Sequence, residues 1–340
     1  MRRLARGVLL LAAVVLAAGL LVVVLVRADE GGDPAPGGDG SGAPTTWPLR
    51  GTPVHGGDAG RPALAVKVDA TQGGRPPIGL GDADVVVEEL VEGGLTRYLA
   101  VFHSRDPEGV GPVRSARSTD IDLLAELGRP LFAWSGANPT FRALVEDADL
   151  VDVGAAAVPD AYRRAEDRRA PYNLLASPSA LRDAAADAGT TPPVLFAYGA
   201  VAMPDARPAA GYRASTTATT IEWTWDEGAA AWRRTQDGTP HVDADGRPIT
   251  ATNVVVRTTE YRDSGVRDMT GAVVPEAVTV GQGDAWVLTA GHAVPARWYK
   301  PAADAPTTYT TLDGTPALLT PGATWVEVLP PGTGDVVGPA

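Results

Sequence analysis

The stretch Gly109-Val110-Gly111-Pro112-Val113-Arg114-Ser115-Ala116-Arg117-Ser118-Thr119-Asp120-Ile121-Asp122 joins a predicted strand to a predicted helix. The apolar run from Leu95 to Phe102 before it is typical of a strand. The apolar residues after it repeat with helical spacing as far as Gly128. We expect Ser118 or Thr119 to cap this helix. Two arginines, two serines and the free N–H groups of a helix end therefore meet in one place.

Such a place suits an anion, because helix N-termini and guanidinium groups bind phosphates and carboxylates. Arg114 and Arg117 are candidate residues for binding a phosphate, a carboxylate or a sugar acid, and Ser115 and Ser118 lie beside them. A structural interpretation stays open as well. In it the helix is only capped, and its arginines pair with nearby acidic residues such as Asp120.

An uncharged apolar segment lies close to the N-terminus. Residues 7–26 contain no charged side chain and follow three arginines. About 20 apolar residues span a bilayer, and basic residues favour its cytoplasmic side. We therefore expect residues 1–6 to be a cytoplasmic stub and residues 7–27 a single-pass transmembrane signal anchor, with all later residues extracytoplasmic at the cell membrane. A long cleaved signal peptide is the alternative, and it leads to the same compartment.

The composition restricts the partners. The chain has no cysteine, so neither a disulfide nor a lipid on a cysteine can anchor it. Its formal net charge is −12, and outside the four arginines that flank the apolar segment 25 basic residues face 41 acidic ones. An acidic extracytoplasmic part argues against nucleic acid as a partner. The four histidines are scattered without metal-ligand spacing, so we expect no metal and no cofactor.

The pattern of elements predicts two domains, in a fold that combines the α+β and α/β classes. Residues 28–46 are rich in glycine, proline and aspartate and form a predicted flexible tether. Strand signals alternate with helix signals over residues 47–200, which predicts an α/β, sandwich-like domain. Residues 201–340 carry strand signals separated by Asp-Gly and Pro-Gly turns, which predicts a mostly antiparallel β domain.

The dipeptide Gly93-Gly94 predicts the turn of a β-hairpin. A two-residue turn pairs Glu92 with Leu95 and puts Glu89 and Arg97 on opposite faces of the sheet. Several charged residues gather near one end of the predicted sheet: Lys67, Asp69, Glu89, Arg97, Arg114, Arg117 and Asp120. They form either the acid and base of a hydrolase or an ion-pair network, and we favour the network because no nucleophile or metal is evident.

Three motifs resemble the YerB-like family of bacterial extracytoplasmic lipoproteins, which contain a domain of unknown function. They are PALAVKVD at residues 62–69, EELVEGGLTRYLAVF at residues 88–102 and VGPVRSARSTD at residues 110–120. The resemblance implies a two-part extracytoplasmic protein without an established reaction. This chain lacks the lipobox cysteine of the family, so a transmembrane anchor takes the place of the lipid. It also has Ala70 and Tyr172 where the family usually has asparagine and histidine.

Three functional hypotheses follow, and whether the protein is an enzyme stays open among them. The first is binding of an anionic cell-envelope component by Arg114 and Arg117, with Asp69 and Glu89 orienting the arginines. The second is a hydrolase or transferase acting on the same material, with Asp69, Glu89 or Asp120 as acid or base. The third is a scaffold for an envelope protein partner.

Overall fold

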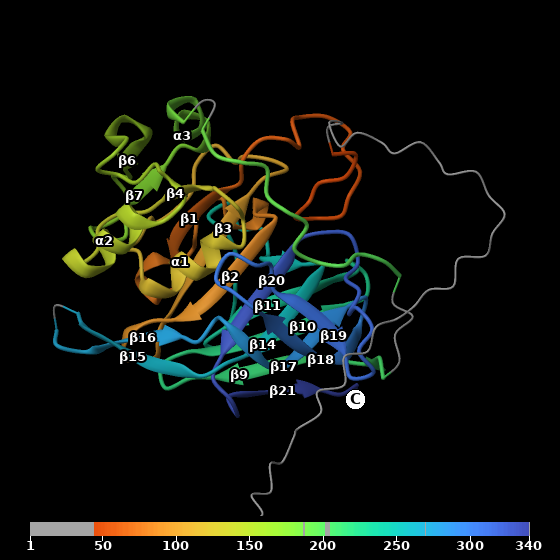
Figure 1. Ribbon diagram of the computed structural model, residues 1–340. Coiled ribbons are helices and arrows are strands. Elements are labelled where there is room, and N and C mark those ends of the chain that lie inside the picture. Colours follow the sequence, from red (N-terminus) through yellow and green to blue (C-terminus); the bar gives the residue numbers. More distant parts are fainter. Residues whose placement is uncertain (1–43, 186–187, 201–204, 269, 340) are drawn as a thin grey trace, which may run out of the picture. The chain divides into compact units, whose positions relative to one another are not determined.

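The computed structural model describes residues 44–185, 188–200, 205–268 and 270–339 (Figure 1). The predicted cytoplasmic stub, the predicted transmembrane segment and the tether as far as residue 43 lie outside these residues. None of the helices in the described ranges is long and apolar enough to cross a membrane. The described residues all belong to one compact unit.

One mixed sheet contains strands from both halves of the sequence. The first half contributes β1 (Leu64–Asp69), β2 (Val85–Leu90), β3 (Thr96–Phe102), β4 (Leu131–Ala133) and β5 (Val151–Asp152). The second half contributes β8 (Arg207–Pro208), β14 (Asn253–Thr258), β17 (Gly281–Thr289), β18 (His292–Lys300), β19 (Thr308–Thr311) and β20 (Thr324–Leu329). Within the described residues the strand order is β19-β18-β17-β14-β20-β2-β3-β1-β4-β5, with β8 beside β18.

The two halves meet where β2 and β20 pair in parallel, from Val85 opposite Thr324 to Glu88 opposite Glu327. In the second half, β14 with β17, β17 with β18 and β18 with β19 are antiparallel, as predicted. The pairing of β14 with β20 is parallel. The predicted α/β part and the predicted β part are therefore continuous through one sheet (Figure 1).

A second sheet belongs to the second half of the chain. It contains β9 (Gly211–Ser215), β10 (Thr220–Asp226), β11 (Ala231–Gln236), β12 (Thr239–Pro240), β13 (Thr250–Ala251) and β21 (Gly334–Val337). The strand signals on both sides of Asp226-Glu227-Gly228 predict a hairpin, and β10 and β11 form it. Two further strand pairs are β6 (Tyr162–Arg164) with β7 (Leu174–Ala176) and β15 (Tyr261–Arg267) with β16 (Val273–Ala277). Short 3-10 turns occur at η1 (Gln72–Gly74), η2 (Leu80–Asp82), η3 (Glu92–Gly94) and η4 (Pro159–Ala161).

Helices occur in the first half. In the described part of the chain they are α1 (Ser118–Ala125), α2 (Pro139–Asp147) and α3 (Pro178–Ala184). The dipeptide Asn138-Pro139 predicts a helix start, because asparagine is a common cap and proline a common first residue. The cap of α2 confirms this, since the Asn138 side chain accepts a hydrogen bond from Phe141 N at 2.9 Å. The predicted helix after residue 120 ends earlier than expected, at Ala125, and tighter i→i+3 hydrogen bonds continue the chain to Gly128.

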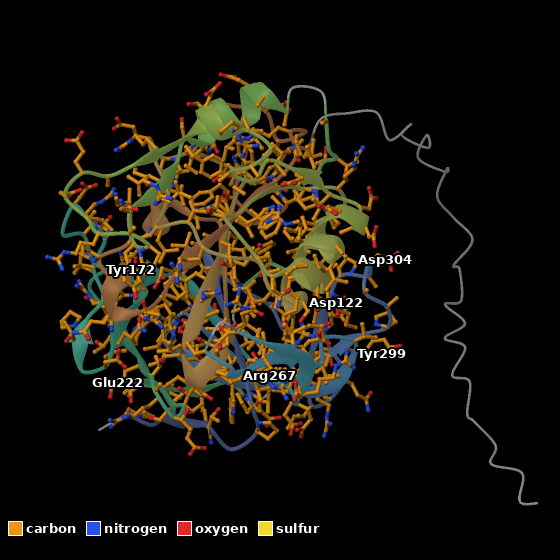
Figure 2. The ribbon with its side chains drawn as sticks, turned by 90° about the vertical axis from the view of Figure 1, so that its left-hand side faces the viewer. Asp122, Tyr172, Glu222, Arg267, Tyr299 and Asp304 are labelled. Atoms are coloured by element: carbon orange, nitrogen blue, oxygen red, sulfur yellow. The ribbon has the colours of Figure 1, made fainter. Side chains whose placement is uncertain are left out.

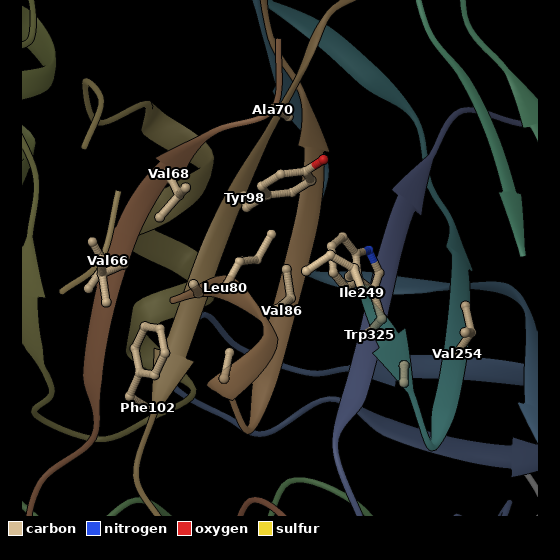
Figure 3. Packing of buried hydrophobic residues seen from close by; sticks show 14 of the residues in the cluster. Val66, Val68, Ala70, Leu80, Val86, Tyr98, Phe102, Ile249, Val254 and Trp325 are labelled. Atoms are coloured by element: carbon tan, nitrogen blue, oxygen red, sulfur yellow. The ribbon is translucent and has the colours of Figure 1, made fainter. Parts of the chain in front are cut away.

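The mixed sheet packs on both faces. Val86 and Trp325 (Figure 3) belong to a core shared with the second sheet. The Trp223 ring of β10 lies 5.2 Å from that of Trp325. Leu99 faces the other side of the sheet and shares a second core with Leu124 of α1. The strand residues of the predicted cluster, Lys67, Asp69, Glu89 and Arg97, lie on this second face.

The hairpin of β2 and β3 differs by one residue from the predicted register. Glu89 lies opposite Arg97, so both side chains face the same side of the sheet, and the predicted opposite orientation is wrong. The physical reason is the turn, which has the three residues Glu92–Gly94 instead of two, with Val91 N donating to Leu95 O at 2.8 Å. The shift brings Glu89 and Arg97 into one polar region.

Candidate functional site

Lys67 lies at the centre of a buried ion-pair cluster between the sheet and α1. Its Nζ contacts Glu89 Oε1 and donates to Asp120 Oδ1 at 2.7 Å. None of the three side chains is more than 1% exposed. Burying a cation with two carboxylates is tolerable only because each charge has a partner, so this cluster holds α1 on the sheet.

The N-terminus of α1 is occupied by a carboxylate of the chain itself. Asp120 Oδ2 accepts a hydrogen bond from Arg117 N at 2.7 Å, and Arg117 is the residue that precedes the helix. The prediction of Ser118 or Thr119 as the cap is therefore wrong, since both lie within α1. Thr119 Oγ1 instead accepts from Ala277 N of β16 at 3.1 Å. Asp120 thus satisfies the N–H group of the residue before the helix and places its own negative charge at this helix end.

Arg114 is held in an ion pair beside the end of β1. Its Nε lies 2.7 Å from Asp69 Oδ2, and its Nη1 donates to Pro171 O at 3.3 Å. The guanidinium group lies over the Tyr172 ring, 5.4 Å from the ring centre. Asp69 Oδ1 accepts from Thr71 N at 2.7 Å. Asp69 therefore orients Arg114, whose side chain is 19% exposed.

Arg117 has a carboxylate partner that the sequence analysis missed. Its Nη2 lies 2.6 Å from Glu92 Oε1, and its Nη1 donates to Ala116 O at 2.9 Å. Glu92 belongs to the hairpin turn. Its position directly before Gly93-Gly94 is the sequence feature from which an acidic partner in this turn could have been predicted. The Phe141 ring of α2 lies 5.9 Å from the guanidinium carbon. The arginine is therefore fixed between the hairpin turn and α2.

Arg97 differs from these two arginines. No carboxylate of the described residues lies within ion-pair distance of it. Its Nη1 donates to Ser115 O at 3.3 Å, and its Nε has no hydrogen-bond partner although it is buried. Burial, with the charges of Arg117 and Arg114, lowers the pKa of Arg97 to about 10, so it stays a cation at neutral pH. Three arginines thus gather around the two carboxylates of Asp69 and Glu92.

Glu89 has an unusual protonation equilibrium. Burial raises the pKa of Glu89 to about 7, against the opposing effect of the Lys67 charge, and the Asp120 carboxylate raises it further. A carboxyl group with a pKa near neutrality is a candidate acid or base. Glu89 is buried, however, and does not line the groove that lies nearby.

This groove runs over Arg117 and has a volume of about 430 Å³. Ser115 and Arg117 line it together with the loop before α2 and the end of the β15–β16 hairpin, which contributes Arg267 (Figure 2). The carboxylates of Glu92 and Asp268 line it too. Both are engaged, because Glu92 pairs with Arg117 and Asp268 accepts hydrogen bonds from backbone N–H groups of its own turn. The groove is therefore bordered by two arginines that each have a carboxylate partner, since Arg267 pairs with Asp263.

The structure brings the predicted residues to one region but separates their roles. Asp69 contacts an arginine, whereas Glu89 and Asp120 contact Lys67. Ser115 lines the groove, and its Oγ donates to Ser135 O at 3.3 Å. Ser118 lies in the first turn of α1, is absent from the groove lining, and its Oγ is buried without a hydrogen-bond partner.

These features define a β-rich protein whose two halves share one sheet and whose polar region is an ion-pair network beside an open groove. Residues 49–191 match the N-terminal domain of the family described as "Protein of unknown function (DUF3048)", and residues 211–326 match its C-terminal domain. The chain belongs to this family, which is the YerB-like family that its motifs resemble.

Two comparisons identify relatives from Bacillus subtilis. The chain is 28% identical to the protein of strain 168 named "Putative lipoprotein YerB". The aligned region has 292 residues and covers 79% of this chain and 82% of the relative. It is also similar to the crystal structure of the YerB protein, with a TM-score of 0.74 at 24% identity. That similarity covers 86% of this chain and 99% of the other, and it shows the common fold.

Proposed function

We propose that this protein is an extracytoplasmic, membrane-associated binding protein whose groove over Ser115 and Arg117 takes an anionic group of a cell-envelope component. The compartment is supported by the apolar segment at residues 7–27 and by the lipoprotein name of the Bacillus subtilis relative. The ligand chemistry is a phosphate or carboxylate, such as peptidoglycan or another envelope polymer carries.

The observation that carries this proposal is the cluster of three arginines, Arg97, Arg114 and Arg117, of which Arg117 lines the groove. Three arginines surround two carboxylates, and Arg97 is the arginine without an acidic partner among the described residues. The Lys67 cluster balances this excess only while Glu89 is ionised, and Glu89 has a pKa of about 7. An anion in contact with Arg117 would neutralise the remaining positive charge, and charge-assisted hydrogen bonds to a guanidinium group would bind it strongly.

Thermal unfolding in the presence of inorganic phosphate tests the proposal on the full-length chain. A ligand at 100 times its dissociation constant stabilises a protein by about 2.7 kcal/mol. We expect phosphate to raise the melting temperature of the wild type and to lose this effect in Arg117→Gln. Arg213→Gln is the matched control, because that side chain is 64% exposed on β9. Equal stabilisation of both variants would contradict the proposal.

A hydrolase or transferase is the second candidate, and one observation favours it, namely the pKa of Glu89 near neutrality beside Lys67 and Asp120. In that case a purified envelope polymer is cleaved or modified by the wild type. Glu89→Gln and Asp69→Asn variants that fold normally would then lose turnover. Turnover that persists in both variants would exclude these carboxylates as acid or base.

A further inference from the structure

Two buried glutamates lie side by side where the two halves of the sequence join. Glu88 of β2 is opposite Glu327 of β20 in the parallel pairing that connects the halves. Both side chains face the core shared with the second sheet, because Val86 and Trp325, two residues earlier on the same strands, belong to that core. Both glutamates are 0% exposed. Two carboxyl groups therefore occupy one buried site between the sheets.

Each of these carboxyl groups has one oxygen in a hydrogen bond and one without a partner. Glu88 Oε2 accepts from Nη2 of the buried Arg234 of β11 at 2.7 Å. Glu327 Oε1 accepts from Trp223 Nε1 of β10 at 2.8 Å. Glu88 Oε1 and Glu327 Oε2 are buried and accept no hydrogen bond from the part of the chain that the structure describes. Since buried polar atoms are nearly always hydrogen-bonded in folded proteins, these two oxygens call for a donor between them.

A proton on one of the two carboxyl groups supplies that donor. The Glu88 and Glu327 side chains are in hydrogen-bonding contact with each other. Two carboxylates in contact repel, whereas a carboxylic acid donates to a carboxylate. Among the described residues, Arg234 is the cation within ion-pair distance of Glu88, and Glu327 has none. One cation balances one carboxylate, so the site is electrically neutral when the second carboxyl group keeps its proton.

The other titratable groups around this site are uncharged at neutral pH. His241 Nδ1 lies 3.0 Å from Nη1 of Arg234. Burial, followed by the charges of Arg234 and Arg75, holds the pKa of His241 well below its ordinary value. Burial also raises the pKa of Tyr98 of β3 and of Tyr212 of β9, so both phenols keep their protons. The charge of the site therefore depends on the two glutamates and Arg234.

We infer that Glu88 and Glu327 share one proton, carried by Glu327, and that this proton makes the connection between the two halves sensitive to pH. Glu88 is the ionised partner because it pairs with Arg234, whereas Glu327 accepts from an uncharged indole. Loss of the proton leaves two buried carboxylates beside one guanidinium group, and their repulsion opposes the pairing of β2 with β20.

The direction of the pH effect follows from proton binding. Burial, followed by the charge of Glu88, holds the pKa of Glu327 well above its ordinary value of 4.5. The folded state therefore holds this proton more tightly than the unfolded chain does. The resulting stabilisation is fully present below pH 4.5 and is lost as pH rises through the raised pKa.

Infrared difference spectroscopy of the full-length chain tests where the proton is. A carboxylic acid and a carboxylate have distinct C–O stretching bands. The wild-type spectrum minus that of Glu327→Gln at pH 7 should contain the band of a carboxylic acid. Glu222→Gln, which removes a partly exposed carboxylate of β10, is the matched control and should give carboxylate bands. Glu89 is present in all three proteins, so its titration cancels. A difference for Glu327→Gln without a carboxylic acid band would overturn the inference.

Urea unfolding of Glu327→Gln and Glu88→Gln distinguishes the two carboxyl groups. Glutamine has the shape of a protonated glutamate and can donate to Glu88, so Glu327→Gln should fold. Glu88→Gln removes the ionised partner of Arg234, so its folding equilibrium constant should be at least about tenfold lower than that of Glu327→Gln. The folding equilibrium constant of the wild type relative to Glu327→Gln should fall by up to about tenfold per pH unit above pH 5. Equal losses in the two variants, or a ratio that does not change with pH, would overturn the inference.

Discussion

At the scale of single residues, the protonation of Glu89 makes the stability of the folded protein depend on pH. Its pKa of about 7 in the folded protein lies above the ordinary value of 4.5, so the folded state holds this proton more tightly than the unfolded chain does. The stabilisation that this tighter proton binding gives the folded state is fully present below pH 4.5 and is lost as pH rises through 7. The free energy of unfolding therefore falls over this window, by at most about 1.4 kcal/mol per pH unit for one proton.

The variant Glu89→Gln tests this coupling, since glutamine keeps the shape of the side chain and cannot ionise. We expect the stability advantage of the wild type over Glu89→Gln to shrink as pH rises from 5 to 7 and to level off above pH 8. Urea unfolding at each pH measures the difference. Two stability curves that stay parallel across this range would show that Glu89 does not titrate there.

At the scale of elements, the turn η3 sets the register that gathers the charged residues. Gly93 and Gly94 have φ values of +70° and +76°, a conformation that other residues adopt only at a cost. A Cβ atom on Gly94 would lie 1.9 Å from Thr217 Oγ1, whereas one on Gly93 would meet nothing within 4 Å. Thr216 Oγ1 also donates to Gly94 O at 2.6 Å. The turn is thus packed on the loop before β10.

Alanine substitutions separate the two roles of this turn. Gly93→Ala is expected to cost about 1–2 kcal/mol of unfolding free energy, from backbone strain alone. Gly94→Ala carries the same strain and a clash with Thr217 besides, so it should be clearly less stable. Chemical denaturation of both variants makes the comparison. Equal losses in the two variants would mean that the contact with Thr217 is unimportant.

Local patterns predicted individual elements well and their combination less well. Alternation of apolar residues predicts a strand over residues 61–69, which is observed at residues 64–69. The cap of α2 and the hairpin of β10 and β11 likewise follow from signals that act over a few residues. The register of β2 and β3 was missed because a Gly-Gly pair fits both two-residue and three-residue turns. The pairing of Arg117 with Glu92 depends on that register and was missed with it.

At the scale of the whole molecule, buried charges connect the two sequence halves. Arg234 of β11 donates to Glu88 of β2 at 2.7 Å, and Lys300 of β18 donates to Glu126, directly after α1, at 2.7 Å. The parallel pairing of β2 with β20 adds backbone hydrogen bonds. Such pairing between distant segments leaves no local pattern in the sequence, so the sequence predicts two domains but not the sheet that they share.

This connection predicts one cooperative unfolding transition for the two halves. Breaking a buried charge pair is costly, so neither half should unfold while the other stays folded. Differential scanning calorimetry of the wild type measures this, with equal calorimetric and van't Hoff enthalpies as the expected result. Two resolved transitions would show that the halves are energetically independent.

The central claim is that the groove over Ser115 and Arg117 binds an anion. Locating an anion in this groove is the most direct test. Tungstate is a tetrahedral oxyanion that resembles phosphate and gives an anomalous X-ray signal. In crystals of the protein soaked with tungstate, we predict an anomalous peak within hydrogen-bonding distance of the Arg117 guanidinium group and the Ser115 side chain. The peak should disappear in Arg117→Gln. A groove without a peak at saturating tungstate would contradict the proposed anion site.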